Sequence, residues 1–338
     1  MLQNSNPQSV HVNSPLISVG MPVYNGERYL NEALQSLLDQ TVRDIELIVA
    51  DNCSTDGTMS ICEMFAEMDS RVVYQRNCSN VGAARNFNKV VDLAQGRYFA
   101  WANYDDVWAP TYLERCLEPL SAGRGIALVY SKTLFIDEHG DELMPAMDNL
   151  HLDAKTSWER LRAYYELFRL NDRNAAVNGL ASEGLWTPVY GLMELDTLRK
   201  TGLIGKYISS DTVLLEEMLM YGQYYEIDEC LFYKRDHPDR SMRACESFDK
   251  RIEWFTGKDR PLMLFPHWRL LIERFKAVLR AKISVYAKTR CLLEAVRFTI
   301  LFKPYIYVKE IAMKGKRLYG IAVRHANFRT KQAHQRGP

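Results

Sequence analysis

The chain has 338 residues, of which 47% are hydrophobic and 25% are charged, a composition typical of a soluble protein with one α/β domain and an appendage. Residues 1–14 are polar, which argues against a signal peptide there, and no apolar run reaches membrane-spanning length. The seven cysteines lack metal-ligand spacing, so we expect reduced thiols in a cytoplasmic protein rather than a zinc site. The net charge of +1 hides an asymmetry: residues 1–250 hold 23 Lys and Arg against 37 Asp and Glu, whereas residues 251–338 hold 20 against 5.

Hydrophobic periodicity predicts strands that alternate with single helices in the first third of the chain. Strands are expected at 16–21, 45–50, 71–75 and 98–102, and helices at 27–40, 57–68 and 82–94. Strands connected in this way form a parallel sheet, and ligands of such sheets bind beyond the carboxyl ends of the strands. The predicted fold class is therefore α/β, with a mostly parallel sheet flanked by helices.

A polar segment follows each of the first three predicted strands. These segments are Pro22-Val-Tyr-Asn-Gly26, Asp51-Asn-Cys-Ser-Thr-Asp-Gly57 and Asn80-Val-Gly-Ala-Ala-Arg85. None is the glycine-rich turn of a dinucleotide site, and none carries the lysine of a P-loop. Both of those nucleotide-binding classes are thereby excluded.

The fourth predicted strand ends in Asn103, Asp105 and Asp106. Two adjacent carboxylates in a poorly solvated place repel each other unless a cation or a proton lies between them. Oxygen ligands of this kind suit Mg²⁺ or Mn²⁺. The alternative is a solvated turn in which Asp106 caps the next helix.

In their order and position, the four segments resemble those of family 2 glycosyltransferases with the GT-A fold. The resemblance covers roughly residues 15–245 and includes the P-x-Y-N opening, the D-N-x-S-x-D-G-T loop, the N-x-G-x-x-x-N segment and a D-x-D-like motif. It implies a nucleotide-sugar donor, Mn²⁺ or Mg²⁺ as the cofactor, and inversion at the anomeric carbon. The D-x-D motif reads Asn103-Tyr104-Asp105 here, so an amide replaces its first carboxylate.

The resemblance also implies a nucleotide-binding set. Asp51 would accept a hydrogen bond from uracil or thymine, and we favour this role over the alternative, an aspartate that only forms the turn of the following loop. Tyr24 would stack on the base, and Glu27 could equally answer the dipole of the next helix. The full set is Pro22, Tyr24, Asn25, Glu27, Asp51, Asn52, Arg85, Asn103 and Arg235.

The family places its catalytic base at the position of Asp211, an aspartate at a helix start, and we therefore predict Asp211 as the base. A helix cap is the alternative for this residue. The metal ligands implied are Asp105, Asp106 and His237, and the alternative for His237 is a loop histidine bonded to backbone. For the tryptophans 158, 186 and 254 we expect core packing, and the alternative is stacking on sugar rings.

The predicted domain organisation has three parts. A flexible N-terminus, 1–14, precedes a GT-A domain at 15–250, with a nucleotide-sugar half at 15–110 and an acceptor half at 111–250. Residues 251–338 are expected to form basic amphipathic helices with a disordered end. Such helices dock on an anionic membrane, bind a partner or cover the catalytic domain, and we favour membrane docking.

The sequence therefore predicts an enzyme that moves a sugar from a UDP- or dTDP-sugar to a hydroxyl group of a saccharide or lipid-linked saccharide, in cell-surface polysaccharide or glycolipid synthesis. A cytoplasmic location is expected, peripheral to the inner face of the plasma membrane. One alternative, raised by Asn103, is an inactive glycosyltransferase-like binding module. The other is a nucleic-acid-binding protein that uses the basic tail, but the acidic half contributes nothing to such binding, and no nucleic-acid partner is expected.

Overall fold

The computed structural model describes residues 14–122, 125–146, 150, 152–178, 185–240, 248–257, 265–301 and 304–312. The strands are β1 (Ile17–Val23), β2 (Ile45–Asp51), β3 (Val72–Arg76), β4 (Tyr98–Trp101), β5 (Val107–Trp108), β6 (Ile126–Ile136), β7 (Glu142–Pro145), β8 (Leu192–Glu194) and β9 (Gln223–Arg235). The longer helices are α1 (Leu30–Leu38), α2 (Thr58–Met68), α3 (Ala83–Leu93), α4 (Tyr112–Ala122), α5 (Ser157–Asn178), α7 (Ser210–Tyr221), α9 (Phe248–Thr256), α10 (Pro266–Arg280) and α11 (Val285–Val296). Two short helices are η2 (Thr187–Tyr190) and α6 (Leu195–Leu198).

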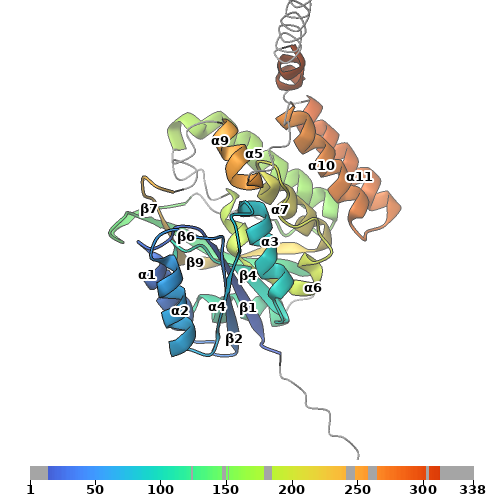
Figure 1. The fold of residues 1–338 in the computed structure, drawn as a ribbon. Coiled ribbons are helices and arrows are strands. Elements are labelled where there is room, and N and C mark those ends of the chain that lie inside the picture. Colours follow the sequence, from blue (N-terminus) through green and yellow to red (C-terminus); the bar gives the residue numbers. More distant parts are fainter. Residues whose placement is uncertain are drawn as a thin grey trace, which may run out of the picture.

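Within these residues, nine strands form one mixed sheet in the order β3-β2-β1-β4-β8-β6-β9-β5, and β7 pairs with β6 (Figure 1). The first four strands pair in parallel, and the connections between them are the helices α1, α2 and α3. The predicted α/β fold is confirmed in this half. The second half adds β6 and β9, which are parallel to each other, and the antiparallel strands β5 and β8.

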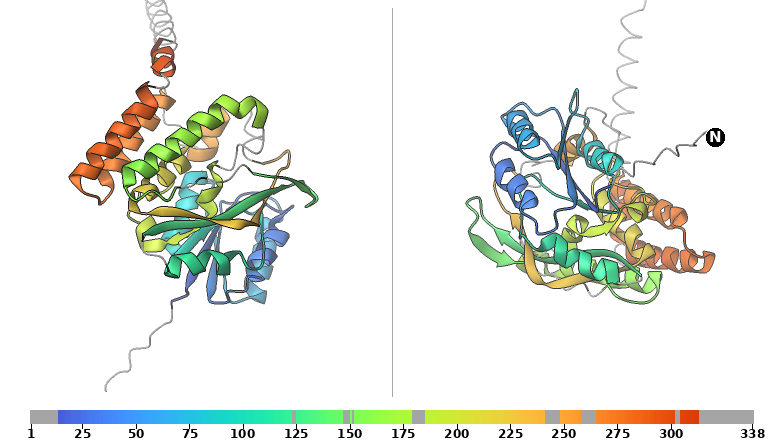
Figure 2. Two further views of the ribbon diagram at one scale, coloured as in Figure 1. Left: turned by 180° about the vertical axis from the view of Figure 1, so that it is seen from behind. Right: turned by 90° about the horizontal axis from the view of Figure 1, so that it is seen from below.

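Two hydrophobic layers hold the helices on the sheet, one on each face (Figure 2). Because side chains alternate between the faces of a strand, Val19 and Met21 of β1 pack in one layer with α1, α2 and α4. Phe99 and Trp101 of β4 point to the other layer, with α3, α6 and α7. Both faces of the central strands are thus buried, as expected for parallel strands.

A third core joins the C-terminal helices to the rest of the molecule. Tyr165 of α5, Val213 of α7, Val278 of α10 and Cys291 of α11 are buried together in it. The boundary expected at 250/251 falls inside α9, and α10 and α11 pack beside α5 and α7 (Figures 1 and 2). The flexible ends expected at 1–14 and at the C-terminus fall on residues outside the described ranges, apart from Ser14.

Among the described segments, none of the helices combines sufficient length with sufficient apolar character to cross a bilayer. The cysteines of these segments are all free thiols, as expected from their spacing.

Candidate active site

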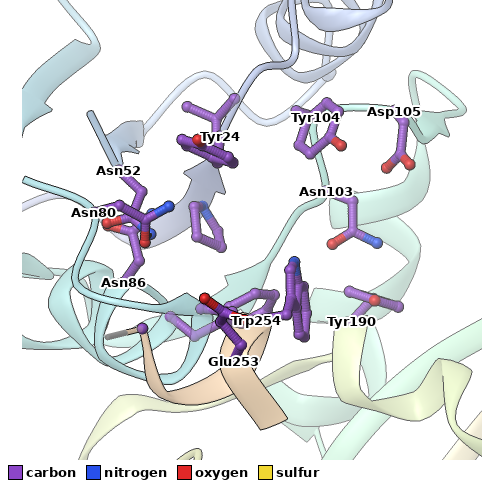
Figure 3. Close-up of a pocket in the computed structure, with 15 residues that line it drawn as sticks. Tyr24, Asn52, Asn80, Asn86, Asn103, Tyr104, Asp105, Tyr190, Glu253 and Trp254 are labelled. Carbon is purple, nitrogen blue, oxygen red and sulfur yellow. The ribbon is translucent and has the colours of Figure 1, made fainter. Parts of the chain in front are cut away.

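A cavity of about 470 Å³ opens where the first four strands end. Its volume lies in the range of small-molecule sites. One side is formed by loops after β1, β2 and β3, the opposite side by the segment after β4 together with η2, and α9 closes a third side (Figure 3). The cavity lies where the order of the polar segments predicted it. Its lining includes five of the predicted site residues, Pro22, Tyr24, Asn52, Asn103 and Asp105.

A network of asparagine side chains shapes the wall formed by the loops after β2 and β3. Asn52 Nδ2 donates to Asn80 Oδ1 at 2.9 Å, and Asn52 Oδ1 accepts from the Val81 N–H at 2.9 Å. Asn86 Nδ2 donates to the Ala50 carbonyl at 2.7 Å. These three asparagines therefore fix the backbone of the wall through specific hydrogen bonds.

Asp51, the residue expected to bind the base, does not line the cavity. Its side chain is fully buried, and Oδ1 accepts from the Ser54 N–H at 2.8 Å. Oδ2 accepts from Arg76 Nη1 at 2.6 Å and from the Tyr74 hydroxyl at 3.0 Å. The carboxylate is satisfied by the protein, and base binding by Asp51 stays a prediction.

Asn25 and Glu27 connect the loop after β1 to the loop after β2. Asn25 has a φ of 52°, and its Oδ1 accepts from the Thr55 N–H at 2.9 Å. Glu27 Oε2 accepts from the Gly57 N–H at 2.8 Å. The structure thus gives both residues a role in holding the two loops together, and neither lines the cavity.

Asp105 and Asp106, which form an acidic corner after β4, have different surroundings. Asp106 is buried, its Oδ2 accepts from Asn103 Nδ2 at 2.8 Å, and its Oδ1 accepts from the Arg235 N–H at 3.0 Å. Burial, followed by the charge of Asp105, raises the pKa of Asp106 above its ordinary value. Asp105 lines the cavity with a side chain that is 14% exposed.

His237 lies beside Asp105, with 3.0 Å between Nε2 and Oδ2. Its ring is buried against Tyr29, and its Nδ1 has no hydrogen-bond partner in the structure. A carboxylate oxygen and an imidazole nitrogen are suitable ligands for Mn²⁺, so this pair fits the predicted cation. Among the described residues, no cluster of three or more His, Cys, Asp or Glu side chains has the arrangement of a metal site. A cation held by Asp105 and His237 therefore needs further ligands from its substrate or from water.

Arg235 and Arg85 do not reach the cavity wall. Arg235 is 2% exposed; its Nε donates to the Asp105 carbonyl at 3.0 Å, and its Nη2 donates to Glu32 Oε2 at 2.6 Å. Arg235 thus holds the backbone of Asp105 in place. To contact a diphosphate directly, Arg235 would have to break its hydrogen bonds to Asp105 and Glu32. Arg85 is exposed on α3.

Asp211, the predicted base, is in the first turn of α7 and is not part of the cavity lining. Ser209 before it has a φ of 63°, which turns the chain into the helix, and Asp211 Oδ1 accepts from the Thr212 N–H at 2.9 Å. Burial is the main cause that raises the pKa of Asp211. Tyr190, which lines the cavity, is close enough to feel the charge of Asp211.

The helix α9 contributes Glu253 and Trp254 to the cavity. The sequence did not point to Glu253, and for Trp254 core packing was expected over a place in a site. Trp254 is 36% exposed and lies across the cavity from Tyr24, not in a core as expected (Figure 3). The end of α9 touches the start of α3 so closely that a Cβ on Gly82 would lie 2.4 Å from the Gly257 nitrogen. The domain boundary expected at 250/251 placed Glu253 and Trp254 in the C-terminal region and so outside the site. The signal that could have indicated a site was a Glu next to a Trp on a short amphipathic helix.

Comparison with known proteins gives an independent result. The family model for "Glycosyl transferase family 2" matches residues 18–176. An uncharacterized glycosyltransferase of Methanocaldococcus jannaschii is 35% identical over 134 residues, which is 39% of this chain and 46% of that protein. A putative teichuronic acid biosynthesis glycosyltransferase, TuaG of Bacillus subtilis, is 41% identical over 104 residues, or 31% of this chain and 41% of that protein. The chain thus spans less than half the length of these two relatives.

Solved structures share the fold. A crystal structure of TarS from S. aureus in complex with UDP-GlcNAc aligns with a TM-score of 0.57 and 15% identity, covering 88% of this chain and 80% of that chain. The mannosyltransferase PcManGT from Pyrobaculum calidifontis, in complex with GDP-Man and Mn²⁺, aligns with a TM-score of 0.50 and 16% identity, covering 96% and 85%. Three observations agree: the family match, the four loop segments at the strand ends and the likeness of fold. The chain therefore belongs to glycosyl transferase family 2 and has the GT-A fold.

Proposed function

We propose that the protein transfers a sugar from a nucleoside diphosphate donor to a hydroxyl group of a saccharide acceptor, with inversion at the anomeric carbon. The observation that carries the proposal is Asp105 at the wall of a cavity built from the ends of parallel strands, with the buried His237 3.0 Å from its carboxylate. A UDP- or dTDP-sugar is the favoured donor. Two structural neighbours were crystallised with UDP-GlcNAc and with GDP-Man, which supports this class of ligand.

Asp105 and His237 would hold Mn²⁺ or Mg²⁺. When bound, the cation supplies positive charge that compensates the negative charge developing on the leaving nucleoside diphosphate. Asp106 holds the corner in shape, because it connects the side chain of Asn103 to the backbone of Arg235. The amide of Asn103 thus takes a structural task at the position where the family has a carboxylate.

Asp211 would act as the general base that removes the proton from the attacking acceptor hydroxyl. A raised pKa makes a carboxylate a stronger base, provided that it is still ionised at the working pH. Tyr190, whose pKa is raised by burial and also by the charge of Asp211, lines the cavity. The oxygen of the acceptor attacks the anomeric carbon as the bond to the diphosphate breaks, and Asp211 receives the proton.

The proposed acceptor is a saccharide or a lipid-linked saccharide of the cell surface, and the proposed location is the cytoplasmic side of the membrane. The support is the likeness to a relative described as a putative teichuronic acid biosynthesis glycosyltransferase. Protein of the full chain should be screened by thermal shift against UDP-, dTDP- and GDP-sugars, with Mn²⁺ and with EDTA. A specific donor raises the apparent melting temperature by mass action.

We expect a metal-dependent shift with one or a few donors, followed by slow hydrolysis of that donor or transfer to an acceptor. If a donor raised the melting temperature equally with Mn²⁺ and with EDTA, the cation would have no part in donor binding. Binding without hydrolysis or transfer to any acceptor tested would favour the binding-module alternative.

A further inference from the structure

The helices α10 and α11 expose a group of apolar side chains near the turn that joins them and along α11. We call it the outer face, and it comprises Leu279 at the end of α10 and Val285, Tyr286 and Leu293 of α11. Each of these four side chains is at least 58% exposed. Contiguous exposed apolar residues on neighbouring helices mark an interaction surface.

The opposite side of the same helices is committed to the protein interior. Arg274 of α10 pairs with Glu216 of α7 at 2.8 Å, and Arg280 pairs with Glu217 of α7 at 2.6 Å. Leu271 and Val278 of α10 are almost fully buried. These contacts fix the rotation of α10, so its exposed apolar residues cannot turn inward to join the core.

The exposed charge of these helical segments is basic. The acidic residues of 265–301 and 304–312 are Glu273, Glu294 and Glu310, and their side chains are only 13%, 8% and 6% exposed. Each is held by a basic partner, and Glu294, for example, pairs with Arg162. The charged residues that are exposed in these segments are all basic, and they are Arg269, Lys276, Arg280, Lys282, Arg297 and Lys309. Three of them are ion-paired, Arg280 with Glu217, and Arg269 and Lys276 with Glu273. Lys282 lies in the turn that joins α10 to α11, beside the outer face.

An anionic lipid bilayer matches this combination. The free energy falls when apolar side chains enter the boundary between the lipid headgroups and the acyl chains. The negative surface potential of the bilayer attracts each nearby lysine or arginine. Nucleic acid would match the charge, but the outer face has a single aromatic ring, Tyr286, beside the aliphatic Leu279, Val285 and Leu293, which cannot stack on bases. We propose that the outer face docks the protein on the surface of an anionic bilayer, a role that does not depend on the proposed sugar transfer.

The test is flotation of the full chain with vesicles of phosphatidylcholine alone and of phosphatidylcholine with phosphatidylglycerol, at low and at high salt. Truncation is unsuitable, since removal of α10 would uncover the core that it shares with α7. One variant, Leu279→Gln/Val285→Gln/Leu293→Gln, removes apolar surface while keeping good helix formers. A second, Lys282→Glu, reverses the exposed charge in the turn between α10 and α11.

The matched control is Met64→Gln/Met68→Gln in α2, where two side chains that are 43% and 73% exposed lie outside the outer face. We expect the parent and the control to float with anionic vesicles and not with neutral ones, and salt to weaken binding. Each of the two outer-face variants should lose about tenfold or more in affinity for anionic vesicles.

Two results would overturn the proposal. One is a parent that floats equally with neutral and anionic vesicles, or with neither. The other is a parent that is a dimer by light scattering and a triple glutamine variant that is a monomer, which would make the outer face a contact between two copies. Binding of UDP, measured on all four proteins, is expected to be unchanged, so failure of docking and failure of the proposed transfer are separate outcomes.

Discussion

Arg274 of α10 and Glu216 of α7 form an enclosed ion pair, with side chains that are 7% and 2% exposed. The Tyr165 hydroxyl also donates to Glu216, at 3.1 Å. The pair connects a helix of the basic C-terminal segment to the helix that begins beside Asp211. The C-terminal helices are therefore part of the framework that positions the predicted base.

The first prediction concerns this pair. Arg274→Met leaves the Glu216 carboxylate buried without its partner, and we expect the free energy of unfolding to fall by about 3–5 kcal/mol. The double variant Arg274→Met/Glu216→Leu should recover most of the loss, because no charge stays buried. Urea denaturation of the parent, both single variants and the double variant measures this cycle. A double variant as unstable as the two losses added together would contradict the assignment.

The second prediction separates stability from chemistry at Asp211. Asp211→Asn should lower transfer by roughly 10²–10⁴-fold while donor binding is kept, because an amide cannot accept the proton. The raised pKa means that the folded state binds this proton more tightly than the unfolded state. Stability contributed by Asp211 therefore falls as the pH rises from its unfolded pKa to its folded pKa.

It follows that Asp211→Asn should be more stable than the parent at pH 7, with a difference that shrinks as the pH falls from the raised pKa of the folded state to the ordinary aspartate pKa and does not change further below it. Thermal unfolding at a series of pH values measures this, and Asp92→Asn, at an exposed position of α3, is the control. A variant that transfers sugar at the parental rate would end the assignment of the base.

The third prediction tests the cation site. Asp105→Asn and His237→Ala should each abolish the difference between UDP binding with Mn²⁺ and with EDTA, because each removes one of two proposed ligands. Isothermal calorimetry gives both affinities, and Mn²⁺ titration without nucleotide gives a second readout. If His237→Ala retains the full metal effect, the histidine only packs against Tyr29.

The fourth prediction concerns Trp254. Trp254→Ala should weaken donor binding about fivefold or more, since an aromatic ring on the wall of the cavity is lost. Tyr225→Ala is the control, because Tyr225 is 49% exposed on β9 and does not line the cavity. Equal affinity in the parent and in Trp254→Ala would exclude the ring from donor contact.

The fifth prediction uses two glycines with similar backbone strain. Gly82 has a φ of 85° and Gly125 a φ of 92°, so alanine is strained at both positions. An added Cβ also collides with α9 at Gly82 but meets nothing within 4 Å at Gly125. We expect both alanine variants to lose stability, and only Gly82→Ala to lose donor affinity as well. Similar UDP affinities in the two variants would show that α9 does not close the site.

The sequence predicted the strands, helices and cavity of residues 16–106 because local signals agree there. Each buried strand ends in a polar loop, and a parallel sheet brings such ends to one edge. Residues whose task depends on neighbours distant in sequence were predicted less well. Asp51 meets Arg76, and Arg235 meets the turn at Asp105, through pairings that no local pattern reveals.

In the C-terminal half, too, the contacts between residues distant in sequence could not be predicted. Its helical periodicity was visible, but periodicity does not say which neighbour a face meets. The buried pairs of Arg274 and Arg280 with α7, and the position of Trp254 in the cavity, depend on tertiary packing. Composition alone marked Arg274 and Arg280 as part of a basic surface, whereas their charges are neutralised by Glu216 and Glu217.

The residues that line the cavity come from positions as far apart in the sequence as Pro22 and Gly257. During synthesis, the site therefore cannot be complete until α9 has left the ribosome and packed against α3. Any molecule that fills the finished cavity holds these distant segments together, and its binding free energy adds to the stability of the whole fold rather than to one loop. Occupancy of the site should thus protect the chain from proteolysis at positions far from the cavity.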